Sequence, residues 1–149
     1  MIEQTIANWH AHVRGRFPGG LDALLHDDCV FYSPVVFTPQ RGKEITKLYL
    51  EAAGATFTPP GQDGIAESKS ERADASPSRG FRYVKEIISG NHAVLEFETE
   101  IDGKFINGID MITCDEEGRI VEFKVLVRPL QAIQLLHAKM AQMLETMKG

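Results

Sequence analysis

Apolar residues recur every three or four positions at the start of the chain. Four of them fall on one face of a helix with 3.6 residues per turn: Ile2, Ile6, Trp9 and Val13. This spacing predicts a helix over 2–16, ended by the Pro-Gly-Gly cluster at 18–20. Three further helices are expected, at 21–25, 42–55 and 129–147. Pro129 is expected at the first position of the last helix, where a missing backbone N–H is tolerated.

From residue 81 onward the period of the pattern changes to two, which is typical of strands. Four strands are predicted, at 81–88, 92–101, 105–114 and 119–128, and a short strand at 29–33 precedes them. The turns between the four are short, and Asp102-Gly103 is a strong hairpin signal. Helices followed by an antiparallel meander indicate an α+β domain with its helices on one face of the sheet, an arrangement that tends to enclose a pocket.

The alternation predicts which residues face this pocket. One face of strand 92–101 carries Leu95, Phe97, Thr99 and Ile101, and one face of strand 119–128 carries Val121, Phe123, Val125 and Val127. Neither face of strand 105–114 is clearly polar, but if Ile106 and Ile112 point inward, then so does Asp110. A carboxyl group in an apolar cavity must be paired, hydrogen-bonded or protonated. The alternative is that Asp110 lies on the outer face or forms an ion pair with Arg128.

The segment 57–80 has no period and is rich in proline, glycine and serine. It predicts a flexible insertion, or alternatively an ordered lid, within a single domain spanning 1–149. The net charge of −5 argues against a nucleic acid or an anionic membrane as partner. Cys29 and Cys114 are expected to be free thiols in a cytoplasmic protein, and no stretch is long and apolar enough for a membrane span. Metal-ligand spacings and phosphate-binding loops are missing, so no metal or cofactor is predicted.

Three segments resemble the nuclear transport factor 2-like (NTF2-like) superfamily, in particular its SnoaL-like polyketide cyclase and ketosteroid isomerase-like groups. They are Leu-Leu-His-Asp-Asp-Cys-Val-Phe-Tyr-Ser-Pro at 24–34, Arg-Gly-Lys-Glu-Ile at 41–45, and Gly-Ile-Asp-Met-Ile-Thr-Cys-Asp-Glu-Glu-Gly-Arg-Ile at 108–120. The resemblance implies a cone-shaped fold in which helices pack on the concave face of a curved antiparallel sheet. It also implies a homodimer formed through the sheet.

The resemblance assigns Asp110 to the place of the isomerases' protonated oxyanion-hole aspartic acid, a carboxyl kept neutral by its apolar site. Ser33 occupies the place of their general-base aspartate, and Trp9 lies roughly at that of their helix-one tyrosine. Because a serine hydroxyl without a partner is no base at neutral pH, steroid isomerisation is not expected. SnoaL-like cyclases use an aspartate for acid/base chemistry in the same cavity, and a nearby histidine would suit that chemistry. His10 borders the apolar stripe of its helix, whereas His12 points away from it.

The sequence therefore predicts a protein with a pocket for a small apolar molecule, possessing an acid/base activity of the cyclase, isomerase or dehydratase type that uses Asp110. The alternatives are a non-catalytic ligand-binding protein and a dimeric interaction module, whose outer sheet face would carry Ile109, Met111 and Leu126. The pocket is expected to be lined by nine residues: Trp9, Val13, Ser33, Leu95, Phe97, Thr99, Phe123, Val125 and Val127.

Overall fold

The computed structural model describes residues 2–57 and 80–148, so the insertion expected at 57–80 lies almost entirely outside the described residues. The helices are α1 (Ile2–Val13), α2 (Gly20–Leu24), α3 (Lys43–Phe57) and α4 (Leu130–Lys148). The strands are β1 (Leu25–Tyr32), β2 (Gln40–Arg41), β3 (Arg82–Ser89), β4 (His92–Ile101), β5 (Lys104–Cys114) and β6 (Ile120–Arg128). Every predicted helix and strand is present, and β2 is an additional strand of two residues.

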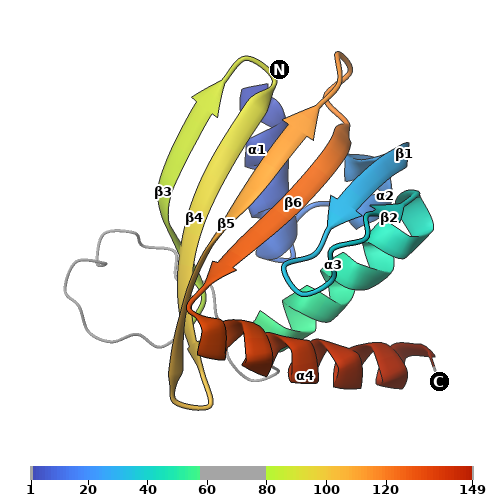
Figure 1. Cartoon of the computed structure of the whole chain (residues 1–149). Coiled ribbons are helices and arrows are strands. Elements are labelled where there is room, and N and C mark those ends of the chain that lie inside the picture. The colour runs from blue at the N-terminus through green and yellow to red at the C-terminus, as the bar shows by residue number, and fades with distance from the viewer. Residues whose placement is uncertain (1, 58–79, 149) are drawn as a thin grey trace.

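The strands form one curved sheet in the order β2-β1-β6-β5-β4-β3 (Figure 1). Neighbouring strands are antiparallel except β1 and β6, which run parallel, so the sheet is mixed where an antiparallel one was expected. Helices α1 and α3 lie on the concave side of the sheet, and α4 crosses beneath its lower end. The predicted α+β class, with a curved sheet covered on one face, is confirmed.

The two-residue period of β4 and β5 determines what faces the helices. In β4, Leu95, Phe97 and Thr99 are buried, whereas the glutamates between them are half-buried. In β5, Ile106, Asp110 and Ile112 are all buried, as their shared parity requires. Asp110 therefore lies on the inner face of the sheet, and the alternative placement on the outer face is wrong.

A β-bulge in β6 changes one predicted face. Cys114 pairs with Ile120 while the adjacent Thr113 pairs with Glu122, which leaves Val121 as the extra residue. Ile120 is consequently buried in the core, and Val121 is only half-buried. The bulge thus substitutes Ile120 for Val121 on the apolar face, and the regular alternation resumes with Phe123.

A second bulge lies in β3. Tyr83 pairs with Phe97 and Lys85 with Glu96, which leaves Val84 unpaired. Tyr83 therefore faces inward together with Phe97. Beyond the bulge the parity changes, so Glu86 lies opposite the inward-facing Leu95. The bulge thus turns both Tyr83 and Glu86 toward the helices.

The start of α4 differs slightly from expectation. The carbonyl of Pro129 accepts hydrogen bonds from the N–H groups of Ala132 and Ile133, so Pro129 is the residue that caps the helix rather than its first helical residue. Leu136 and Met140 on this helix are buried beneath the sheet. Within the described ranges, none of the helices combines the length and apolar character that crossing a membrane requires.

Candidate functional site

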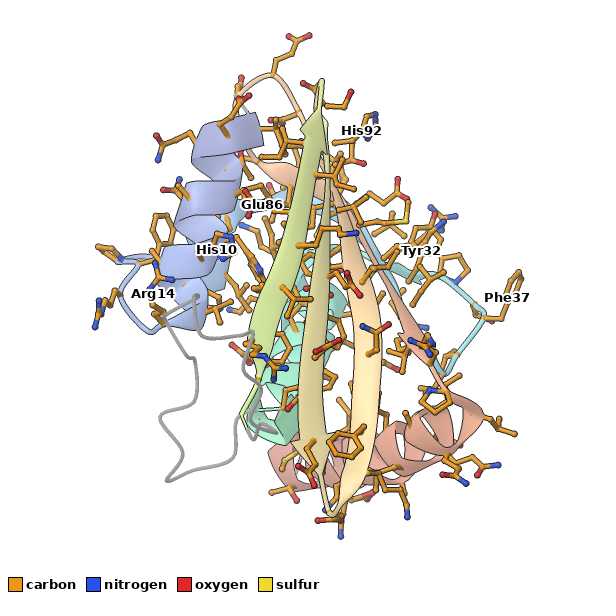
Figure 2. All side chains as sticks on the ribbon, turned by 90° about the vertical axis from the view of Figure 1, so that its left-hand side faces the viewer. His10, Arg14, Tyr32, Phe37, Glu86 and His92 are labelled. Atoms are coloured by element: carbon orange, nitrogen blue, oxygen red, sulfur yellow. The ribbon has the colours of Figure 1, made fainter. Side chains whose placement is uncertain are left out.

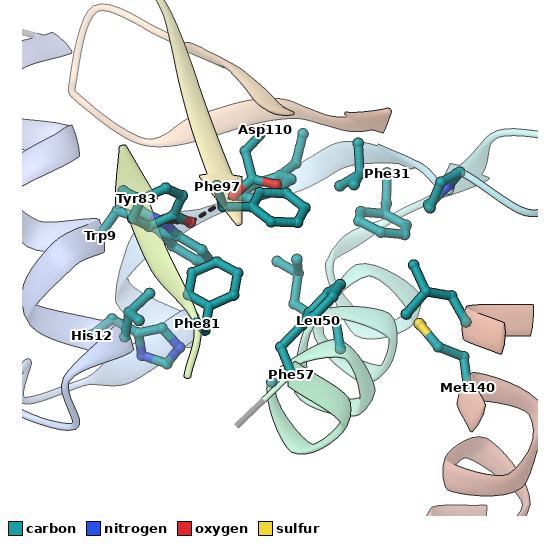
Figure 3. A pocket seen from close by; sticks show the side chains of 17 residues that line it. Trp9, His12, Phe31, Leu50, Phe57, Phe81, Tyr83, Phe97, Asp110 and Met140 are labelled. Carbon is teal, nitrogen blue, oxygen red and sulfur yellow. Dashed lines mark hydrogen bonds between the residues drawn. The ribbon is translucent and has the colours of Figure 1, made fainter. Parts of the chain in front are cut away.

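A cavity of about 320 Å³ lies between the concave face of the sheet and the helices (Figure 3). Its walls are mainly apolar and rich in aromatic side chains. Helices α1 and α3, strands β1, β4 and β6, and the residue before β3 contribute six of these: Trp9, Phe57, Phe31, Phe97, Phe123 and Phe81. Leu136 and Met140 of α4 line it as well. This volume is at the lower end of the range of pockets that hold small organic molecules.

Asp110 is the one carboxylic acid among the described residues that line the cavity. Its side chain is only 6% exposed, and its Oδ2 atom accepts a hydrogen bond from the Tyr83 hydroxyl at 2.6 Å (Figure 3). Among the described residues, Oδ1 has no hydrogen-bond partner. Burial in the apolar wall raises the pKa of Asp110 to about 7, although the hydrogen bond from Tyr83 opposes this rise.

Tyr83 connects Asp110 to helix α1. The indole Nε1–H of Trp9 donates a hydrogen bond to the Tyr83 hydroxyl oxygen at 3.0 Å. Burial and the neighbouring charge of Asp110 raise the pKa of Tyr83 well above its ordinary value, so the phenol stays protonated and donates to Asp110. Trp9, Tyr83 and Asp110 thus form a chain in which every donor points toward the carboxyl group.

The position of Tyr83 is supported from the side of α1. Glu86, which the bulge in β3 turns inward, lies 2.9 Å from Nε2 of His10 (Figure 2). The His10 ring meets the Tyr83 ring edge-on, with 5.3 Å between the ring centroids. These contacts attach β3 to α1 at the level of the tyrosine.

Gly108 provides the space for the aromatic wall. It pairs with Phe97 across the β4–β5 ladder, and the Phe97 ring lies over its Cα. A Cβ atom at this position would lie 2.5 Å from Phe97 Cζ and 2.6 Å from the Leu126 carbonyl oxygen, and both distances are far below van der Waals contact. A glycine here is therefore required by the close approach of Phe97.

The structure brings six of the ten sequence-predicted site residues together. Asp110 and five of the nine predicted pocket residues line the cavity: Trp9, Val13, Phe97, Phe123 and Val125. The other four, which are Ser33, Leu95, Thr99 and Val127, do not line it. The cavity occupies only the middle of the concave face. Leu95 is packed into the core on the side of α1, whereas Thr99 and Val127 lie toward the opposite end of the sheet.

Ser33 lies outside the cavity because the chain leaves β1 after Tyr32. Its hydroxyl oxygen accepts a hydrogen bond from the Val35 backbone N–H at 3.1 Å. This bond holds the turn that leads into the loop carrying Phe37. Ser33 therefore stabilises this turn and does not line the cavity.

Sequence reasoning missed Tyr83 and misplaced the histidines. The alternation in 81–88 has no clearly apolar face, and only the bulge reveals that Tyr83 points inward. Asp110 forms no ion pair with Arg128, which instead donates a hydrogen bond to Asn107 on the outer face. His12 lines the cavity, contrary to expectation, while His10 pairs with Glu86.

The His12 side chain is half-buried, and its ring stacks at a tilt on Trp9, with 5.5 Å between the centroids. Burial lowers the pKa of His12, although the negative charge of Glu51 on α3 opposes this effect. The imidazole is therefore neutral at pH 7. The signal that could have identified His12 is its position three residues after Trp9, one helical turn along the same helix.

No protein-family model matches the sequence, and no curated protein matches it. The fold matches the crystal structure of a steroid delta-isomerase from Pseudomonas aeruginosa, with 31% identity and a TM-score of 0.78 over 97% of this chain and 92% of that one. An NTF2-like protein of unknown function from Mesorhizobium loti matches with 16% identity and a TM-score of 0.62, covering 86% and 91% of the two chains.

A protein of the SnoaL-like family from Agrobacterium tumefaciens also matches, with 16% identity and a TM-score of 0.53 over 85% of this chain and 96% of that one. The likeness to the Mesorhizobium and Agrobacterium proteins concerns the fold alone. The likeness to the Pseudomonas protein extends to the sequence over nearly the full length of both chains. Together with the three sequence motifs and the curved sheet, it shows that the chain belongs to the NTF2-like superfamily, among its ketosteroid isomerase-like members.

Proposed function

We propose that the protein is an isomerase-type enzyme that transfers a proton on a small, uncharged, apolar carbonyl compound held in the cavity, with Asp110 as the acid/base group. One observation carries this proposal: the carboxyl group of Asp110 lines a largely apolar cavity, and burial there raises its pKa to about 7. A group with this pKa is present in both protonation states near neutral pH, which suits general acid/base catalysis.

The hydrogen bonds around Asp110 support this role. Tyr83 occupies Oδ2, and Oδ1 is the atom left for a ligand in the cavity. Because Trp9 and Tyr83 both donate toward the carboxyl group, Asp110 has the same hydrogen-bonded partner in its protonated and ionised forms. Apolar walls exclude water, so a ligand carbonyl would find Asp110 as its main polar partner on the sheet side.

The decisive experiment follows the exchange of protons at the carbon next to a ketone. The lack of a carboxylate at Ser33 argued against steroid isomerisation, but the Pseudomonas aeruginosa neighbour, at 31% identity, is a steroid delta-isomerase. The probe is therefore a 3-ketosteroid whose double bond lies one carbon away from conjugation. Proton NMR in D₂O measures exchange, and ultraviolet absorbance measures formation of the conjugated ketone. We expect Asp110→Asn to lower the rate by about 100-fold or more, because general acid/base groups contribute at least this much.

The matched control is Asp115→Asn, which changes a carboxyl group in the β5–β6 turn, away from the cavity. This variant should retain the wild-type rate. Equal rates for the wild type and Asp110→Asn would refute the role of Asp110. Binding of the steroid without exchange would favour the alternative of a non-catalytic ligand-binding protein, which also has the aromatic cavity in its favour.

The outer face of the sheet favours a second role, as an interaction surface. Met111, Leu126 and Phe105 are 39%, 46% and 65% exposed on strands β5 and β6. We propose that a second copy of the chain covers this face and that the protein acts in the cytoplasm, where its buried thiols Cys29 and Cys114 stay reduced. A monomeric mass at micromolar concentration by native mass spectrometry would contradict the homodimer.

A further inference from the structure

We propose that His12 is the general base of the reaction and that Asp110 acts opposite it as the general acid. This inference rests on the proposed function and assigns the two halves of the proton transfer. Both side chains line the same cavity, His12 from α1 and Asp110 from β5 (Figure 3). It also explains why the chain does without a carboxylate at Ser33, which lies outside the cavity.

Two side chains in the cavity wall, His12 and Asp110, have atoms that can still form hydrogen bonds. The indole N–H of Trp9 is taken by Tyr83, and the hydroxyl of Tyr83 is taken by Asp110. Among the described residues, neither ring nitrogen of His12 has a hydrogen-bond partner, and the same holds for Oδ1 of Asp110. Polar atoms in a partly buried, largely apolar cavity normally have hydrogen-bond partners. We therefore infer that a bound ligand supplies the partners of His12 and of Oδ1.

The charges around each group favour opposite protonation states. Burial keeps the His12 imidazole neutral, so a ring nitrogen has a lone pair at pH 7. Glu51 of α3 is the charged group that acts on it, and Glu86 of β3 is already paired with His10. Burial favours the protonated form of Asp110, whose acidic O–H on Oδ1 can donate to a carbonyl oxygen.

The reaction balances without a cofactor. A ring nitrogen of His12 takes a proton from the carbon next to the carbonyl. As that C–H bond breaks, its electron pair forms the C=C bond of an enol, and the carbonyl oxygen takes the proton of Asp110. The imidazolium of His12 then gives its proton to the far carbon of the substrate's original C=C bond, whose electron pair forms the new C–H bond. The electron pair of the enol C=C bond moves to the adjacent position and forms the conjugated C=C bond. As the carbonyl reforms, the enol proton goes back to Asp110.

The test uses His12→Gln, which keeps a polar side chain but provides no base at neutral pH, and His12→Ala as a second variant. The matched control is His137→Gln, which changes an exposed histidine on α4. With the ketosteroid probe, we expect both His12 variants to lower kcat by about 100-fold with a change of less than about threefold in KM. The control should keep the wild-type kcat, and circular dichroism verifies that each variant is folded.

The pH profile separates a base from a structural residue. For the wild type, kcat/KM should rise as His12 loses its proton and fall as Asp110 loses its own, because the neutral base and the protonated acid are both required. His12→Gln should remove the acidic limb, and Asp110→Asn should remove the alkaline limb. A His12→Gln variant that keeps the full rate, or keeps the acidic limb, overturns the inference and leaves the proposed function standing.

A binding readout keeps the inference testable apart from turnover. The probe is 2-naphthol, a flat phenol that resembles an enol, and the signals are those of the histidine rings in NMR spectra. We expect the His12 ring signals to shift on saturation while those of His137 stay unchanged. If 2-naphthol binds in the cavity and the His12 signals do not move, the inference is wrong. A wild type that neither binds the phenol nor exchanges the ketone overturns the proposed function itself.

Discussion

Replacing Asp110 with asparagine should change the pH dependence of stability. The free energy of unfolding of Asp110→Asn, relative to that of the wild type, should increase as the pH rises. The carboxyl group has a pKa of about 7 in the folded chain, against an ordinary value of 3.8. A raised pKa means that the stability linked to the bound proton is fully present below 3.8 and is lost as the pH rises through 7. Asparagine has the same size, still accepts the hydrogen bond from Tyr83 and does not ionise.

The magnitude follows from the two values. Each tenfold change in acidity corresponds to about 1.4 kcal/mol, so ionising Asp110 removes about 4 kcal/mol of folding free energy over the whole range. Between pH 5 and pH 8 the loss is about 2.5 kcal/mol, because part of it has already occurred at pH 5. Relative to the wild type, Asp110→Asn should gain this amount across that interval.

The assay is urea unfolding of both proteins at pH 5, 6, 7 and 8, read as the difference between their free energies of unfolding. Groups common to both proteins cancel in that difference. Asp115→Asn is the control, because backbone hydrogen bonds from Arg119 and Glu117 lower the pKa of Asp115, so its contribution should not change between pH 5 and 8. A pH-independent difference for Asp110→Asn would refute the argument that burial raises the pKa of this carboxyl.

Three further predictions concern neighbouring residues. Tyr83→Phe should raise the pKa of Asp110 further, because it removes the one hydrogen bond that the described part of the chain donates to the ionised carboxylate. Carbon-13 NMR titration of the carboxyl group measures this, and an unchanged value would contradict the assigned contact. Gly108→Ala should destabilise the protein by about 1–3 kcal/mol in urea unfolding, since a Cβ would collide with Phe97 and a backbone oxygen. Ser33→Asp should not increase exchange of the ketosteroid probe, because residue 33 lies outside the cavity; a gain of tenfold or more would place it inside.

The parity of Asp110 could be predicted because β5 is regular around it. Ile106 and Ile112 have the same parity as Asp110, so the three residues share a face. Because Ile109 and Met111 on the other face are also apolar, the sequence left both placements open, and the structure decides for the inner one. No comparable rule predicts that Tyr83 points inward. The pairing slips by one residue at Val84, and a bulge depends on tertiary contacts that the alternation in one strand does not encode.

Helical periodicity was similarly incomplete as a guide to the cavity. It placed Trp9 and Val13 on the inner face of α1, and both line the cavity. His12 lies at the margin of that face, where a half-buried side chain faces either solvent or a cavity according to what packs nearby. In this chain Phe57 of α3 and Phe81, next to the start of β3, line the same cavity as His12, which makes His12 part of its wall.

Tyr83 is carried by β3, the last strand in the sheet order and the one paired on a single side, whereas Asp110 lies on the central β5. Strands at the edge of a sheet open locally at a lower free energy than the strands inside it. Detachment of β3 would separate the donor from the acid while β4, β5 and β6 stay folded. A local opening equilibrium of β3 therefore sets the fraction of molecules in which Tyr83 is hydrogen-bonded to Asp110. The contact between His10 and Glu86, which attaches β3 to α1, shifts this equilibrium toward the closed state.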